Sequence, residues 1–298
     1  MPFAYDLQIL GQPDAVAGLL GQKVRRLDRQ RPTLFTGIGS SQHACRVAAY
    51  WRGALAVAVE PGDLMTRVLT PHDQVAAVSH RGESALFAHV LAHGRAAGAW
   101  TVAVVGTDAP TPAAEQVLRT CARETAGTHS VSYVTALVRL AQLVGLGDEL
   151  AEVPDAIRRT LAAPEPDVSV IPALIAGNGV DAITASEAAL KLKEACCVWT
   201  EGMSIEMALH GPLAALTPPM GAIVFTPAPR LVPALQAKGV PVITCGSDAA
   251  NELRFVPCGP VARALVSVVP VQRYAASLAR RLGTNPDVEI AYPADSGT

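Results

Sequence analysis

Short apolar segments that run into a glycine-rich turn and then into a helical pattern recur along this chain of 298 residues. Residues 33–37 lead into Gly-Ile-Gly at 37–39, and residues 168–176 lead into Gly-Asn-Gly at 177–179. After each turn, apolar residues recur every three or four positions, as on one face of a helix. Strands and helices that alternate in this way form parallel sheets. The pattern therefore predicts an α/β fold with doubly wound, mostly parallel sheets flanked by helices.

The expected elements fall into two similar halves. The expected strands are residues 33–37, 74–79, 101–105, 168–176, 221–226 and 241–245, and the expected helices are 42–55, 83–97, 131–144, 182–194, 229–237 and 261–282, the last interrupted at Pro270. We predict a helical lead-in over residues 1–29, a first subdomain over 30–147, an acidic, proline-bearing linker over 148–166 and a second subdomain over 167–298. The two glycine turns lie about one domain apart, which suggests an internal duplication.

Composition limits the function classes. Half of the residues are hydrophobic but only 4% are aromatic, so the core must consist mainly of Ala, Val and Leu. The formal net charge is −2 and no basic block occurs, whereas nucleic acid or an anionic membrane would require a concentrated positive face. No apolar run reaches the roughly 18–20 residues that span a bilayer, and the first residues do not resemble a signal peptide. We expect a cytoplasmic protein without nucleic-acid or membrane partners.

The cysteines do not suggest a metal site. They are Cys45, Cys121, Cys196, Cys197, Cys245 and Cys258. None forms a CxxC pair or a Cys/His cluster with zinc-ligand spacing. We predict that they are small buried hydrophobes, with no disulfide, no metal and no cofactor.

Two of the strand–helix turns carry hydroxyl groups that suit an anion. The first has Gly39, Ser40 and Ser41 at the start of its helix, and the second, Ser-His-Arg-Gly-Glu-Ser at residues 79–84, follows the next expected strand. Backbone N–H groups and the helix dipole favour negative charge there, and ligands of doubly wound sheets bind outside the carboxyl ends of the strands. Serines at a helix start also serve as ordinary caps. Two such turns on adjacent strands favour a phosphate group, to which Arg81 would add a charged fork.

One expected helix carries charged residues inside an apolar stretch. Glu187, Lys191 and Glu194 lie at positions i, i+4 and i+7 and share one helical face. Such a row is commonly a surface ion-pair ladder, but its Ala, Leu and Cys neighbours predict a buried helix, in which charges are paired or functional. His210 follows downstream, where Gly-Pro ends a local helix and leaves the imidazole at its end.

Together these motifs resemble those of the sugar isomerase (SIS) family, especially the isomerase part of glucosamine-6-phosphate synthase. The resemblance covers nearly the whole chain in order. The matching segments are residues 39–41 (family Gly-Thr-Ser), 79–84 (Ser-Gln-Ser-Gly-Glu-Thr), 124–135 (the segment that passes the sugar), 187–194 (Glu-Gly-Ala-Leu-Lys-Leu-Lys-Glu) and 210–213 (His-Gly-Pro-Leu). The specific part of the match is the helix at residues 187–194 followed by His210, sixteen positions after Glu194.

The resemblance implies two tandem SIS subdomains, a homodimer, and a phosphosugar isomerase or an amino-sugar-phosphate isomerase or deaminase that acts on a hexose 6-phosphate. It implies that Glu194 moves a proton between C1 and C2 and that His210, reaching the neighbouring subunit's site, assists ring opening. The residues it implies for substrate binding are Gly39, Ser40, Ser41, Ser79, His80, Arg81, Ser84, Thr128, His129, Glu187 and Lys191, with Ser41, Ser79 and Ser84 on the 6-phosphate.

The chain departs from the family pattern at several positions. His80 and Arg81 replace a neutral polar pair, and His129 and Val131 stand where the family has Ser and Lys. A glutamine-hydrolysing domain with an N-terminal catalytic cysteine is not found in the sequence, so glutamine-dependent synthesis is not expected. The family's C-terminal lysine, which forms a Schiff base with the ketose, has no counterpart after residue 283, because the lysines are Lys23, Lys191, Lys193 and Lys238.

The missing lysine leaves two functions open. The reaction proceeds without an imine, as plain aldose–ketose isomerisation can, or the protein is a non-catalytic phosphosugar sensor. A Rossmann oxidoreductase shares the α/β pattern but leaves the motifs at residues 187–194 and 210–213 unexplained. A DNA-binding regulator of the same family would need a helix-turn-helix and a basic face, for which residues 1–30 are too short and too mixed in charge.

Overall fold

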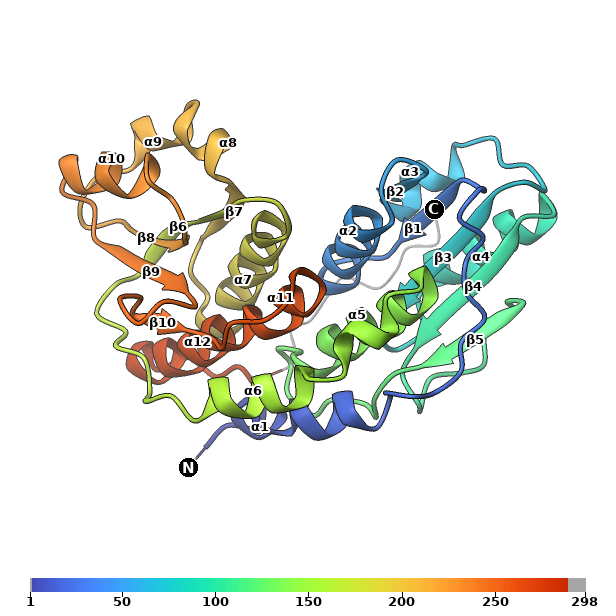
Figure 1. Ribbon diagram of the computed structural model, residues 1–298, viewed down its shortest axis with the longest axis horizontal. Coiled ribbons are helices and arrows are strands. Elements are labelled where there is room, and N and C mark those ends of the chain that lie inside the picture. Colours follow the sequence, from blue (N-terminus) through green and yellow to red (C-terminus); the bar gives the residue numbers. More distant parts are fainter. Residues whose placement is uncertain (1, 289–298) are drawn as a thin grey trace. The chain divides into compact units, whose positions relative to one another are not determined.

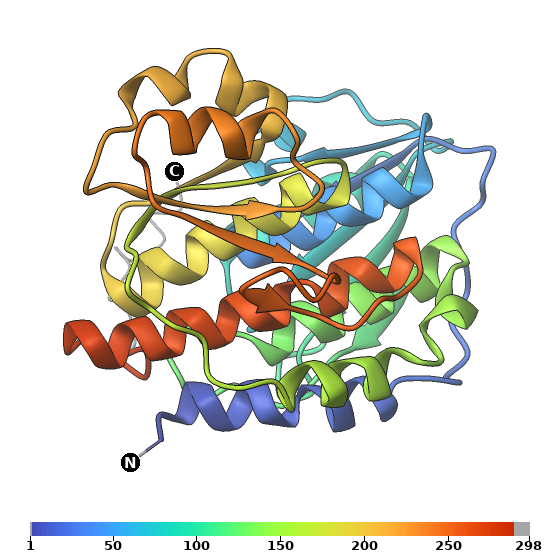
Figure 2. The same cartoon turned by 60° about the vertical axis from the view of Figure 1, so that its left-hand side comes forward.

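The computed structural model describes residues 2–288 and divides into two compact units (Figure 1 and Figure 2). The N-terminal unit comprises residues 14–124 and 131–151, and the C-terminal unit comprises residues 2–13, 125–130 and 152–288. Each unit is built around one five-stranded sheet.

The N-terminal unit has the strand order β2-β1-β3-β4-β5, and every pairing is parallel. Its strands are β1 (Thr33–Thr36), β2 (Ala56–Val59), β3 (Gln74–Ser79), β4 (Trp100–Val105) and β5 (Gln116–Arg119). Its helices are α2 (Ser40–Arg52), α3 (Pro61–Met65), α4 (Ala85–Ala96), α5 (Val131–Val144) and the 3₁₀-helix η1 (Gly147–Leu150).

The C-terminal unit has the strand order β10-β9-β8-β6-β7, again with parallel pairing throughout. Its strands are β6 (Pro172–Gly177), β7 (Glu201–Ser204), β8 (Gly221–Phe225), β9 (Val242–Gly246) and β10 (Leu253–Arg254). Its helices are α6 (Val153–Leu161), α7 (Val180–Cys196), α8 (Ile205–Leu209), α9 (Pro212–Ala215), α10 (Leu231–Ala237), α11 (Pro260–Val266) and α12 (Val268–Leu282). The helix α1 (Ala4–Ala17) begins in this unit and ends in the N-terminal unit.

The two units share one topology. Numbered from the first strand of each sheet, both follow the order 2-1-3-4-5. The first strand of each sheet ends in a glycine turn of the same shape, with φ 59° and ψ −129° at Gly39 and φ 55° and ψ −124° at Gly179. A positive φ with this ψ is open to glycine and strained for other residues. The prediction of an α/β fold with two doubly wound parallel sheets is confirmed.

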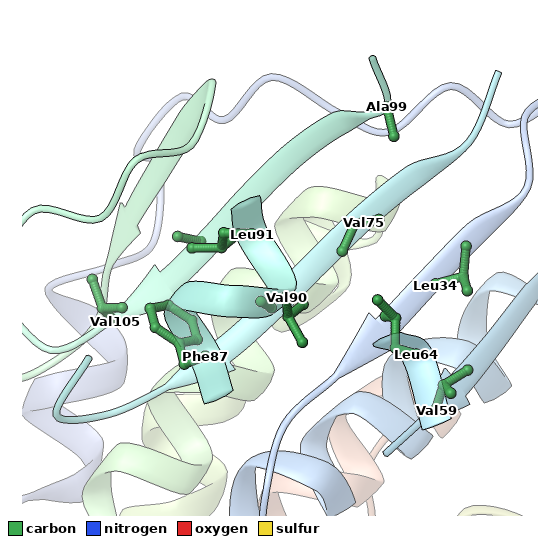
Figure 3. Close-up of a cluster of buried hydrophobic side chains, with 11 residues drawn as sticks. Leu34, Val59, Leu64, Val75, Phe87, Val90, Leu91, Ala99 and Val105 are labelled. Carbon is green, nitrogen blue, oxygen red and sulfur yellow. The ribbon is translucent and has the colours of Figure 1, made fainter. Parts of the chain in front are cut away.

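The core of the N-terminal unit shows why its strands read as apolar runs. Along β3, Val75 and Ala77 point to the face covered by α3 and α4, where Phe87 and Leu91 pack on them (Figure 3). The alternate residues of β3 are also buried, so both faces of the sheet are covered. Full burial of a side chain such as Phe87 contributes about 1.5–3 kcal/mol, and this fixes α4 and the turn that precedes it.

Several predicted elements differ from the structure. The last helical region breaks at Ser267 and not at Pro270, because Pro270 lies in the first turn of α12, where its missing N–H would have no intrahelical partner. The lead-in is helical only to Ala17, after which Gly21 adopts a φ of 74°. The segment expected as a linker contains α6.

All six cysteines are free thiols. Burial raises the pKa of Cys121 and Cys258 to about 11, and that of Cys45 and Cys245 well above its usual range. Cys197 is exposed, contrary to the prediction, because it ends α7 in a left-handed conformation with φ 54°. Among residues 2–288, no helix combines the length and hydrophobicity needed to cross a membrane.

Candidate active site

The first predicted phosphate turn joins β1 to α2 in the N-terminal unit. Gly37 is required there, because a Cβ at this position would lie 2.8 Å from the Cβ of Ser41. The N–H of Ser41 donates to the carbonyl of Ile38 (3.1 Å), and the N–H of Gln42 donates to that of Gly39 (3.0 Å). These two N–H groups are therefore engaged within the turn. The hydroxyl group of Ser41, in the first turn of α2, is a donor that this turn can offer to an anion.

The second predicted turn joins β3 to α4, on the strand next to β1. Ser79 accepts a hydrogen bond from the N–H of Gly82 (3.1 Å), so its hydroxyl proton is free to point elsewhere. Ser84 stands at the N-cap position of α4 but makes no side-chain capping bond. Its Oγ is buried and has no hydrogen-bond partner among the described residues. A buried hydroxyl in this state costs about 1–3 kcal/mol, which is offset if a ligand accepts its proton.

His80 and Arg81 play different parts in the second turn. The ring and carbonyl of His80 pack against Gly106, where a Cβ would lie 2.8 Å from the carbonyl oxygen of His80. Burial lowers the pKa of His80, and the positive charges of Arg81 and Arg123 add to this effect, while Glu124 opposes it. His80 is therefore a neutral ring at physiological pH, and Arg81 is the positively charged group of the turn.

Two residues around this turn, Arg123 and Glu124, are not among the predicted site residues, although Glu124 begins the segment expected to pass the sugar. Arg123 follows β5, and its guanidinium lies 3.8 Å from the carboxylate of Glu83. Glu124 is buried, and its carboxylate accepts the N–H groups of Val131 (2.9 Å) and Ser132 (2.8 Å) at the start of α5. Glu124 thereby ties the two ends of the loop over residues 125–130. Both residues follow the end of β5. This strand is too short and too polar to be predicted from the sequence, so the residues after it were not predicted as part of a site.

Thr128 and His129 lie on that loop, in the C-terminal unit. Thr128 is buried, and its N–H donates to the carbonyl of Pro286 (2.9 Å), beside the bond from Gly127 to Asp287 (3.2 Å). Asp287 in turn accepts the N–H groups of the first residues of α1. The loop is therefore fixed to the segment that follows α12.

The charged row on α7 is the best-defined part of the site. Glu187 is 0% exposed and Lys191 is 1% exposed, so the prediction of a buried helix is confirmed. The Nζ of Lys191 lies 3.6 Å from Glu187 Oε1 and donates a hydrogen bond to Glu194 Oε2. The side chain of Glu194 keeps 14% of its surface exposed. Lys191 thus neutralises a buried carboxylate and orients an accessible one.

The sequence explains how α7 is held. Gly202 on β7 allows the strand to lie directly on the helix, since a Cβ there would be 2.3 Å from the carbonyl oxygen of Ala185. The helix then ends at Cys197, whose N–H caps the carbonyl of Lys193. These contacts fix the turn of α7 that carries Glu194.

His210 caps the carboxyl end of the short helix α8, which begins at the N-cap Ser204 and stops before Gly211 and Pro212. Its side chain is 74% exposed, and its Nε2 lies 3.7 Å from Glu206. The structure therefore brings Glu187, Lys191 and Glu194 together, while His210 projects into solvent with Glu206 as its acidic neighbour. An imidazole in this position can reach a group outside its own chain.

Comparison with solved structures shows which proteins share this fold. The C-terminal domain of glucosamine-fructose-6-phosphate aminotransferase from Francisella tularensis matches 97% of this chain and 99% of its own, with a TM-score of 0.84 at 18% identity. Tagatose-6-phosphate ketose/aldose isomerase from Escherichia coli (TM-score 0.76, 18% identity, 98% and 97% covered) and glucosamine-6-phosphate deaminase from Thermotoga maritima (TM-score 0.77, 15% identity, 95% and 96% covered) have the same fold. At the level of the fold, the expectation drawn from the resemblance to the sugar isomerase family is confirmed, because the chain shares the fold of these sugar-phosphate enzymes.

Sequence comparison finds relatives that share one name. Glutamine–fructose-6-phosphate aminotransferase (isomerizing) from Mycolicibacterium paratuberculosis is 26% identical over 321 residues, which cover 90% of this chain and 51% of that protein. The same enzyme from Streptomyces coelicolor is 28% identical over 265 residues, covering 74% and 43%. The chain thus spans about half the length of the curated relatives it matches. No protein-family model matches it.

Proposed function

We propose that this protein is a phosphosugar isomerase, or an amino-sugar-phosphate isomerase or deaminase, that acts on a hexose 6-phosphate. The observation that carries the proposal is the position of Glu194. Its carboxylate is accessible and is held by the buried Lys191, which also forms an ion pair with the buried Glu187. A general acid–base needs this combination of fixed position and access. The relatives support the substrate class, because they act on fructose, tagatose and glucosamine 6-phosphates by name.

The phosphate is assigned to the serine turns of the N-terminal unit. Ser41 and Ser79 stand at the ends of adjacent strands, and Ser84 supplies a buried hydroxyl that lacks a partner among the described residues. Arg81 adds positive charge beside them. These groups suit a phosphate monoester, whose oxygens accept several hydrogen bonds at once.

In this mechanism Glu194 removes the proton from C2 of the open-chain aldose and returns it to C1, through an enediol or, with an amino sugar, an enolamine. Lys191 keeps the carboxylate in place. His210 assists ring opening in the site of a partner subunit, which its exposure at the end of α8 supports.

The test is hydrogen exchange at the sugar. Fructose 6-phosphate, glucose 6-phosphate and glucosamine 6-phosphate are incubated with the protein in D₂O, and deuterium at C1 and C2 is followed by NMR. Glu194→Gln should slow exchange by about 10²–10⁴-fold. Glu201→Gln, which changes an exposed carboxylate on β7, should leave it unchanged. If the wild-type protein exchanges neither position of any of these sugars, the catalytic proposal is wrong.

A non-catalytic phosphosugar sensor is the alternative, and the lysines favour it. Lys191 is engaged by two carboxylates and Lys238 donates to a surface carbonyl of Ala214. Neither offers the free amine that an imine requires. A sensor would be stabilised by a hexose 6-phosphate in a thermal melt without turnover, and Glu194→Gln would not affect that stabilisation.

A further inference from the structure

The glycine turn of the C-terminal unit has a different residue at the position that Ser41 occupies in the N-terminal unit. A Cβ on Gly37 would lie 2.8 Å from the Cβ of Ser41, and a Cβ on Gly177 would lie 2.7 Å from the Cβ of Asp181. Each is the fourth residue after its glycine and the second residue of its helix. Asp181 is therefore the counterpart of Ser41.

The strand registers identify the counterpart of the second turn. The paired positions are Thr36 with Ala77 in the N-terminal sheet and Ala176 with Val224 in the C-terminal sheet. Since both pairs precede the glycine turn by one residue, Ala77 corresponds to Val224. Two residues further along, Ser79 corresponds to Thr226. Two of the three serines proposed to hold phosphate, Ser41 and Ser79, thus correspond to Asp181 and Thr226.

Arg263 contacts both of these counterparts. Arg263 on α11 donates from Nε to both carboxylate oxygens of Asp181 (2.8 and 2.9 Å) and from Nη2 to one of them (2.7 Å). The same Nη2 donates to the carbonyl of Thr226 (3.3 Å). Side-chain exposure is 9% for Asp181 and 24% for Arg263. A guanidinium therefore spans the positions where the N-terminal unit would receive an anion.

The chemistry of this pair is that of anion recognition. A guanidinium binds a carboxylate and a phosphate with the same forked geometry, and a negative charge is favoured at the start of a helix such as α7. Although burial by itself would lower the pKa of Arg263, its hydrogen bond and charge interaction with Asp181 raise it. The hydroxyl of Thr226 is also engaged, by Asn251 (3.1 Å).

We propose that Asp181 is a built-in anion that closes the turn of the C-terminal unit by occupying the place of a phosphate on Arg263. Removal of this carboxylate converts the turn into a second site for inorganic phosphate or a phosphate monoester. In the wild-type protein the turn takes no ligand, and, given the proposed function, each chain binds its phosphosugar only through the serine turns of the N-terminal unit.

Asp181→Ser tests the proposal, because it installs the residue of the N-terminal turn and leaves Arg263 in place. The probe is inorganic phosphate, counted by equilibrium dialysis and followed by thermal melts. Asp181→Ser should bind one more phosphate per chain than the wild-type protein, and phosphate should raise its Tm by a larger amount. The double variant Asp181→Ser/Arg263→Gln should lose both gains.

Two results would overturn the proposal: no additional phosphate on Asp181→Ser, or a phosphate on the wild-type protein that Arg263→Gln alone removes. If Asp181→Ser does not fold, the isosteric Asp181→Asn replaces it, and a phosphate-dependent stabilisation no greater than that of the wild type is then the contrary result. These comparisons do not depend on turnover. A wild-type protein that ignores every hexose 6-phosphate would refute the proposed function and leave this test intact.

Discussion

Lys191 lies between two carboxylates on α7, 3.6 Å from Glu187 and hydrogen-bonded to Glu194. Its ammonium group forms an ion pair with the carboxylate of Glu187, which is fully buried. A buried ion pair adds little net stability over an apolar substitute, but removal of one partner leaves an uncompensated charge. Lys191 is therefore needed for folding as well as for the orientation of Glu194.

We predict that Lys191→Met lowers the free energy of unfolding by about 3–5 kcal/mol, measured by urea denaturation. The matched control is Lys193→Met on the same helix. Lys193 is partly exposed and lies 4.8 Å from the ring of Trp199, so its loss should cost about 1 kcal/mol or less. If the two substitutions lower the free energy of unfolding equally, the ion pairs of Lys191 with Glu187 and Glu194 do not make Lys191 more important for stability than Lys193.

Ser84 and Ser204 occupy the same kind of helix position with opposite hydrogen bonding. Ser204 accepts the N–H of Met207 (3.2 Å), whereas Ser84 has no partner for its buried hydroxyl among the described residues. We predict that Ser204→Ala costs about 1 kcal/mol of stability and that Ser84→Ala costs none. Ser84→Ala should instead weaken binding of a hexose 6-phosphate by about tenfold or more, measured by calorimetry. A stable Ser84→Ala variant with unchanged affinity would remove Ser84 from the phosphate site.

At the scale of elements, the contact between β7 and α7 decides where the charged row stands. Gly202 permits this contact, and any side chain there meets the backbone of α7 at Ala185. We predict that Gly202→Ala lowers stability by about 1–3 kcal/mol and reduces exchange activity, because the helix must move. The control is Gly11→Ala inside α1, where a Cβ has open space; it should raise stability by about 0.5–1 kcal/mol. Thermal melts and the D₂O assay measure both, and a neutral Gly202→Ala would contradict the packing argument.

The sequence predicts the buried elements well and the edges of the sheets poorly. Strand β3 and helix α5 have the predicted bounds, because an element buried on all sides is mostly apolar along its length. Edge strands such as β2 and β10 were missed, since they are short and partly exposed. Pro270 was misjudged because its effect depends on its place within a helix.

The candidate site likewise has features that the sequence predicts and features that it does not. The charged row on α7 could be predicted, since its spacing and apolar neighbours are local features. The hydrogen-bonding state of Ser84 and the partner of Asp181 could not. Asp181 and Arg263 are 82 positions apart, and only the fold brings such residues together.

At the scale of the molecule, the two units share a topology but carry different chemistry. The serine turns belong to the N-terminal unit, and the charged row, His210 and the closed turn at Asp181 belong to the C-terminal unit. Each sheet has a hydrophobic core of its own, so the residues in the turns of one unit can differ from those of the other without loss of either core.

The exposure of His210 leads to a prediction about the assembled protein. If His210 serves the site of a partner subunit, as proposed, then the variants Glu194→Gln and His210→Asn should each be inactive as pure homodimers. When equal amounts of the two variants are mixed, unfolded and refolded together, random pairing makes half of the dimers heterodimers. Each heterodimer contains one site with an intact Glu194 and an intact His210 from the other chain, so the mixture should recover about a quarter of wild-type exchange activity, within the range expected for independent sites. If His210 instead acts within its own chain, every site in the mixture carries one defect and no activity returns, which would place the histidine and the carboxylate on one subunit.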